Sequence, residues 1–185
     1  MKILLKVGLI IVLLLNNSFA SKLDVCFTPP SGCSEKIIDE INNAKNTIYV
    51  QAYGFTSKSI ADSLINAHLR GIKVSIILDR SNIAQKGYSK FKDLKQAGVD
   101  ISIDVVPGIA HNKVMIIDEK KVITGSFNFT EAADKRNSEN VIIIEDKEVV
   151  NLFDFNQCQR VVDVGGNQGS LGAQILNKYP NPHLV

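Results

Sequence analysis

The chain reads His111-Asn112-Lys113-Val114-Met115-Ile116-Ile117-Asp118 and then, after six further residues, Gly125-Ser126-Phe127-Asn128. His111 and Lys113 are two residues apart at the start of a predicted strand, so their side chains point to the same face. Apolar residues over 113–117 and 121–124 flank the turn at 118–120, which predicts a hairpin. This hairpin brings Ser126 and Asn128 back beside His111 and Lys113, at one end of a sheet.

These four side chains supply an imidazole, an ammonium, a hydroxyl and an amide. Lys113, Ser126 and Asn128 suit the non-bridging oxygens of a phosphate, because they offset the charge that builds up in the transition state. The imidazole of His111 can attack phosphorus or move a proton. The sequence shows no carboxylate cluster there for Mg²⁺ or Ca²⁺ and no Cys/His spacing typical of zinc. The pattern therefore predicts phosphoryl transfer without a metal or another cofactor.

The rest of the chain alternates predicted strands with predicted helices. Strands are expected over 24–27, 47–52, 73–78, 100–106, 113–117, 121–124 and, as the last one, 140–144. Helices are expected from an N-cap at Ser34, from Ser57 or Ser59 to a stop at Gly71, over 88–97 and over 147–157. The alternation predicts an α/β sandwich with a mixed sheet flanked by helices. Part of the sheet should be antiparallel, since residues 113–144 contain no long helix.

The two ends of the chain differ from this pattern. Residues 1–20 combine Lys2 and Lys6, an apolar run over 7–15 and Ser18-Phe19-Ala20, which predicts a signal peptide and a secreted or periplasmic protein. An uncleaved N-terminal anchor is the alternative. Residues 21–157 are expected to form a single domain. The glycines and prolines of residues 158–185 predict a poorly ordered tail.

Charge and cysteine content narrow the function further. Without Lys2 and Lys6, the chain has 19 basic and 19 acidic residues, so it lacks the basic excess typical of nucleic-acid-binding proteins. Cys26 and Cys33 are separated by a short loop rich in proline and glycine, which allows a disulfide in an exported protein.

The residues from His111 to Asn128 resemble the HKD motif of the phospholipase D superfamily. Residues 51–56, 76–80, 106–108 and 137–140 agree with this resemblance, which extends from about Val25 to Gln157. The chain is most similar to small bacterial members with one HKD motif and a signal peptide. These members include secreted phospholipases D and periplasmic endonucleases.

The resemblance implies a role for each motif residue. His111 matches the histidine that attacks phosphorus to form a phosphohistidine, and Lys113 matches the phosphate-binding lysine. Ser126 and Asn128 match the remaining partners of the phosphate and the lysine. Glu139 matches a carboxylate that hydrogen-bonds the far nitrogen of the histidine and fixes its tautomer. Asp118 completes the catalytic motif, but its place in the turn predicts that it organises the backbone.

The family's reaction needs a nucleophile and a separate acid, and this chain has one HKD motif. The resemblance therefore implies a homodimer in which two copies of His111 share one active site. The expected function is a phospholipase D that hydrolyses phosphatidylcholine-like lipids to phosphatidic acid and a free headgroup. A nonspecific endonuclease, with nucleic acid as the substrate, is the alternative.

Overall fold

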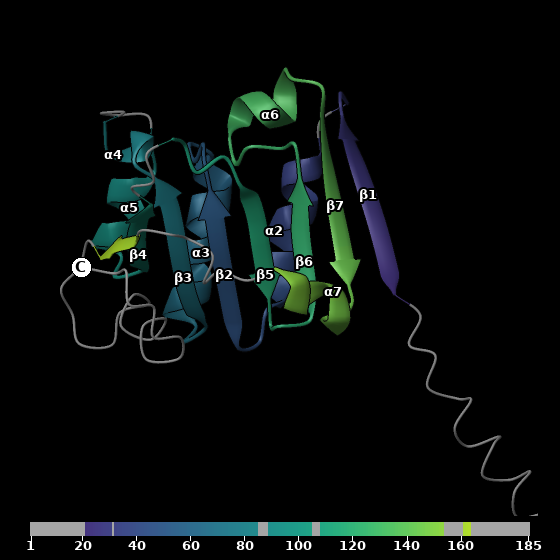
Figure 1. Ribbon diagram of the computed structural model, residues 1–185, viewed down its shortest axis with the longest axis horizontal. Helices are drawn as coiled ribbons and strands as arrows, with labels where there is room; N and C mark the ends of the chain where they lie inside the picture. The colour runs from purple at the N-terminus through teal and green to yellow at the C-terminus, as the bar shows by residue number, and fades with distance from the viewer. Residues whose placement is uncertain (1–20, 31, 85–88, 105–107, 154–160, 164–185) are drawn as a thin grey trace, which may run out of the picture.

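The computed structural model describes residues 21–30, 32–84, 89–104, 108–153 and 161–163. The predicted signal peptide over 1–20 and most of the predicted tail lie outside these residues. The described part forms one mixed sheet with helices on both faces (Figure 1). None of its helices has the length and apolar character needed to span a membrane.

The sheet has eight strands in the order β1-β7-β6-β5-β2-β3-β4-β8. The strands are β1 Lys22–Thr28, β2 Thr47–Ala52, β3 Lys73–Asp79, β4 Asp100–Asp104, β5 Lys113–Ile117, β6 Lys121–Gly125, β7 Glu139–Glu145 and β8 Val161–Asp163. β3 is parallel to β2 and β4, and all other neighbouring pairs are antiparallel. The predicted α/β sandwich with a mixed sheet is confirmed.

The helices cover the two faces of the sheet unequally. They are α2 Cys33–Asn43, α3 Lys58–Leu69, α4 Ser81–Ala84, α5 Phe91–Gln96, α6 Glu131–Lys135 and α7 Lys147–Leu152. α2 and α3 pack side by side behind the sheet in the view of Figure 1, and Ile37 and Ile41 of α2 are fully buried there. Val150 of α7 packs on the other face with Val114 and Ile116. The central strand β5 is buried along its whole length because both of its faces are covered.

The two long helices differ in how their first turns are capped. Ser57 is the N-cap of α3, and its Oγ accepts a hydrogen bond from the backbone N–H of Ile60 at 3.4 Å. The prediction that Ser34 caps α2 is wrong, because this helix begins at Cys33. Its free N–H groups at Gly32 and Ser34 donate instead to the carboxylate of Asp134, at 3.2 and 3.0 Å. An acceptor from α6 thus replaces a local cap.

Other elements differ from their predicted bounds at the edges. In the described residues the helix predicted over 88–97 spans Phe91–Gln96, and the helix predicted over 147–157 ends at Leu152 because Phe153 is extended. The strand β8 follows β7, so the expectation that 140–144 is the last strand is wrong. β8 lies within the predicted tail.

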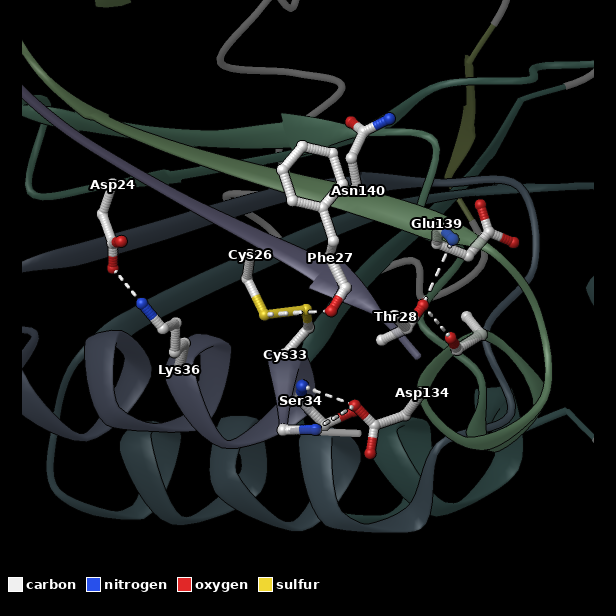
Figure 2. The surroundings of a disulfide bond; sticks show 12 residues. Asp24, Cys26, Phe27, Thr28, Cys33, Ser34, Lys36, Asp134, Glu139 and Asn140 are labelled. Carbon is white, nitrogen blue, oxygen red and sulfur yellow. Dashed lines mark hydrogen bonds and ion pairs between the residues drawn. A yellow bond between two sulfur atoms is a disulfide. The ribbon is translucent and has the colours of Figure 1, made fainter. Parts of the chain in front are cut away.

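Cys26 of β1 and Cys33 of α2 form a disulfide, as the short loop between them allows (Figure 2). The bond joins the edge strand of the sheet to the first residue of the helix that covers it.

Candidate active site

Several chain segments meet at one end of the sheet, the upper end in Figure 1. β5 begins there with Lys113, β6 ends there with Gly125, and β7 begins there with Glu139. His111 comes just before β5, and Ser126 comes just after β6. The antiparallel strands β5, β6 and β7 therefore bring four of the predicted site residues to the same edge.

Gly125 allows β6 and β7 to approach closely at this edge. Its φ is +145°, and a Cβ atom there would lie 2.3 Å from the backbone oxygen of Asn140. Only glycine fits without moving the backbone. The neighbouring Ser126 then accepts a hydrogen bond on Oγ from the backbone N–H of Asn140 at 3.1 Å.

Lys113 is a buried cation, with 8% of its surface exposed. Its Nζ donates to the backbone oxygen of His111 at 2.9 Å and lies 5.3 Å from the centre of the Tyr53 ring. Burial lowers the pKa of Lys113 below its ordinary value, and the nearby negative charge of Glu139 only partly opposes this effect. A poorly solvated ammonium interacts more strongly with an incoming phosphate oxygen than a hydrated one does.

His111 is exposed, and its ring packs against the ring of Tyr53. The two ring centroids are 4.6 Å apart, and the ring planes are tilted by 58°. The backbone N–H of Tyr53 also donates to the oxygen of Asn112 at 3.0 Å, which ties the end of β2 to the start of β5. Within the described residues, neither ring nitrogen of His111 has a hydrogen-bond partner. The described residues therefore hold the imidazole by ring packing and leave its two nitrogens without a hydrogen bond.

Glu139 lies beside this group at the start of β7. One carboxylate oxygen accepts from Ser126 Oγ at 2.5 Å, and the other accepts from Asn137 Nδ2 at 3.0 Å. The expected hydrogen bond between Glu139 and His111 is not formed among the described residues. Ser126 was expected to contact phosphate, and in this structure its hydroxyl donates a hydrogen bond to Glu139.

Asn128 lies near the end of β2. A Cβ atom added to Gly54 would be 3.5 Å from both Cβ and Oδ1 of Asn128. Oδ1 of Asn128 is buried and has no hydrogen-bond partner within the described part of the chain. No hydrogen bond joins it to Lys113 there, so its part in phosphate or lysine binding stays a prediction.

Asp79, at the end of β3, also supports the site. Its carboxylate accepts from the backbone N–H groups of Ser81 and Ala110, both at 2.9 Å. Ala110 directly precedes His111. Burial favours the neutral acid, but the hydrogen bond from the Ser81 side chain, these two backbone hydrogen bonds and the charge of Arg80 outweigh it and lower the pKa of Asp79. No motif signals this contact, since it joins residues 31 positions apart.

Asp118 lies at the opposite end of β5 from His111. Its carboxylate accepts from the backbone N–H groups of Lys45, Asn46 and Thr47 at 2.7–3.2 Å, just where β2 begins. The expectation that Asp118 organises the backbone agrees with these bonds.

Among the described residues, no group of three or more His, Cys, Asp or Glu side chains is placed to hold a metal ion.

Residues 37–157 match the family described as "Cardiolipin synthase, PLD-like domain". This span covers more than half of the chain and contains every site residue from Tyr53 to Glu139. The chain belongs to the phospholipase D family. It is therefore a phosphodiesterase of the phospholipase D type by family.

Curated relatives support the same assignment. A protein named phospholipase D from Rickettsia felis is 59% identical over 140 residues, which are 76% of this chain and 70% of that protein. The mitochondrial cardiolipin hydrolase of Mus musculus is 34% identical over 129 residues, which are 69% of this chain and 58% of that protein.

A solved structure of the phospholipase D family has the same fold. Nuc from Salmonella typhimurium superposes with a TM-score of 0.67 at 32% identity, covering 72% of this chain and 90% of Nuc.

Proposed function

We propose that this phospholipase D family member cleaves phosphodiesters through a phosphohistidine intermediate on His111, without a metal or another cofactor. The observation that carries the proposal is the group at one end of the sheet. An open imidazole lies beside a buried ammonium, with the Ser126–Glu139 pair next to them. Such a group offers a nucleophile and a fixed positive charge for a phosphate.

In the first step, a ring nitrogen of His111 attacks phosphorus. An N–P bond forms, and the bond from phosphorus to the leaving alcohol oxygen breaks. Lys113 offsets the charge on the non-bridging oxygens, and Ser126 and Asn128 are proposed to donate to the same phosphate. Glu139 is proposed to orient the imidazole, once Ser126 turns its hydroxyl proton from the carboxylate to the phosphate. The leaving alkoxide needs a proton from a second acid.

We propose that this acid is His111 of a second chain in a homodimer. Outside this site, the described residues contain one other histidine, His68, which lies in the last turn of α3 beside Gly98. α3 begins at the site end and runs away from it, so His68 is poorly placed to act. In the second step, the partner His111 takes a proton from water, the water oxygen attacks phosphorus, and the N–P bond breaks. A phosphate monoester and free His111 result.

The proposed substrate is a phosphatidylcholine-like phospholipid, cleaved to phosphatidic acid and the free headgroup. The relative named phospholipase D at 59% identity supports a lipid, and so does the more distant cardiolipin hydrolase. An endonuclease activity is the alternative. The described site residues are proposed to contact the phosphate group itself, which lipids and nucleic acids share, and this supports the endonuclease alternative.

We also propose that residues 1–20 direct export to the periplasm or the medium. The disulfide between Cys26 and Cys33 supports this proposal, because such bonds persist in oxidising compartments.

One experiment tests the activity and its substrate together. The purified protein is incubated with EDTA and either labelled phosphatidylcholine vesicles or plasmid DNA. Release of headgroup supports the lipase, and cleavage of DNA alone would exclude it. His111→Asn should reduce the rate by several orders of magnitude. Light scattering at the assay concentration should give a dimer, and a fully active monomer would rule out the shared site.

A further inference from the structure

We propose that Thr28 is a positioning residue for Glu139, and that it links the active site to the disulfide-bonded edge of the sheet. This inference rests on the proposed function of the site. Thr28 is the last residue of β1 and is only 4% exposed. It has no place in the HKD motif.

The hydroxyl of Thr28 touches the segment that carries Glu139 at three points, and Figure 2 shows the contact with the backbone N–H of Glu139. Its Oγ1 lies 2.9 Å from the backbone oxygens of Ala133 and Asn137, to either of which it can donate. The same Oγ1 accepts from the backbone N–H of Glu139 at 3.2 Å. One hydroxyl therefore holds both the end of α6 and the first residue of β7.

These contacts fix one of the two residues that hold the Glu139 carboxylate. Asn137, whose backbone oxygen Thr28 contacts, donates from its side chain to Glu139 Oε1 at 3.0 Å. Thr28 and Glu139 are also direct partners in the β1–β7 register. Without the hydroxyl, the N–H of Glu139 would lose this acceptor, and the segment from 133 to 139 would be held by fewer hydrogen bonds.

The edge strand that carries Thr28 is joined to α2, and α2 is joined to α6. Cys26, two residues before Thr28, is bonded to Cys33 at the start of α2. Asp134 of α6 accepts hydrogen bonds from the first turn of the same helix, at Gly32 and Ser34. β1, α2 and α6 thus form a closed connection around Thr28, which places its hydroxyl within reach of Glu139 (Figure 2).

The test compares Thr28→Val, which removes the hydroxyl and keeps the shape, with Thr28→Ser, which keeps the hydroxyl. The substrate is bis(4-nitrophenyl) phosphate, a small diester that is neither lipid nor nucleic acid. The kcat of Thr28→Val should fall about tenfold with KM unchanged, because the hydroxyl does not contact the substrate. The kcat of Thr28→Ser should stay within about twofold of the wild type.

Thr47→Val is the matched control. The hydroxyl oxygen of Thr47 is buried at the far end of β2 and has no hydrogen-bond partner among the described residues. The same substitution there removes an oxygen without breaking a bond, so kcat should not change.

A double-mutant cycle separates positioning from general stability. If Thr28 acts through Glu139, Thr28→Val should lower kcat less than about twofold when Glu139→Gln is already present. An equal loss in both backgrounds would overturn the proposal, and so would a wild-type kcat for Thr28→Val. If Thr28→Val does not fold, Thr28→Ser decides. A fivefold or greater loss of kcat in Thr28→Ser would also contradict the proposal. A wild-type protein that cleaves no diester, lipid or DNA would overturn the proposed function instead, and this inference with it.

Discussion

The ammonium of Lys113 donates a hydrogen bond to the backbone oxygen of His111, at 2.9 Å. The proposed phosphate-binding group is therefore fixed to the main chain of the proposed nucleophile. The two groups keep one spacing without a contact between their side chains. A phosphate that reaches Lys113 is then held close to the imidazole.

The lowered pKa of Lys113 predicts a pH dependence of substrate binding. Because burial moves this pKa below 10.5, Lys113 should lose its proton at a lower pH than an exposed lysine does. The KM should therefore rise as the pH increases through that lowered value. Steady-state kinetics with bis(4-nitrophenyl) phosphate between about pH 7 and pH 10 measure this rise in KM. In Lys113→Arg the rise should disappear from this pH range, because a guanidinium stays charged. An unchanged rise in KM would assign it to another group.

The contact between Tyr53 and His111 predicts a role for the aromatic ring. Tyr53→Leu should lower kcat about tenfold, because it removes a ring that packs on both His111 and Lys113. Tyr53→Phe keeps the ring and should stay within about threefold of the wild type. Tyr49→Leu serves as the control, since Tyr49 lies on β2, which ends just before Tyr53, and packs near α7; this variant should change stability but not kcat. Equal kcat values for Tyr53→Leu and Tyr53→Phe would show that the ring is not needed.

Asp118 should matter mainly for folding. Asp118→Ala removes the acceptor of three backbone N–H groups and should lower the free energy of unfolding by about 2–3 kcal/mol in urea denaturation. Its kcat, corrected for folded protein, should fall far less than that of His111→Asn. A loss as large as that of His111→Asn would give Asp118 a part in the chemistry.

Asp118 also predicts a difference in acid stability. Burial favours the neutral acid, but the backbone hydrogen bonds prevail and lower its pKa below 3.8. The stabilisation by the ionised carboxylate is therefore complete above pH 3.8, and it is lost as the pH falls through the lowered pKa of Asp118. The difference in unfolding free energy between wild type and Asp118→Ala should shrink in this acid range. A constant difference would mean that the charge is not involved.

The disulfide should contribute to stability through the short loop that it closes. Replacing Cys26 and Cys33 with serine should lower the free energy of unfolding by about 2.5 kcal/mol, the chain-entropy value for a loop of this length. Guanidinium denaturation measures the change. Wild-type protein in reductant is the matched control and should unfold like the double variant. A midpoint that reductant does not move would contradict the prediction.

The hairpin at the site was predictable because its signals are local. Apolar residues over 113–117 and 121–124 and the turn between them fix the register of β5 and β6. The same register brings Ser126 to the start of β5, as the sequence predicted. The end of α3 at Gly71 was equally visible, since a positive φ favours glycine there.

Contacts between distant residues were not predictable in this way. Ser34 has the composition of an N-cap, but the acceptor for α2 is Asp134, about 100 positions away. Glu139 was expected at the imidazole, whereas the described structure holds it with Ser126 and Asn137. The contacts of the Thr28 hydroxyl and of the Asp79 carboxylate with distant residues could not be predicted from the sequence, because their partners are backbone groups.

Gly125 limits how this site can be altered. The atom that excludes a side chain there is a main-chain oxygen, that of Asn140. No substitution of Asn140 removes that oxygen. A second substitution at position 140 should therefore not restore a Gly125→Ala variant. Libraries aimed at new substrates should therefore keep Gly125 constant.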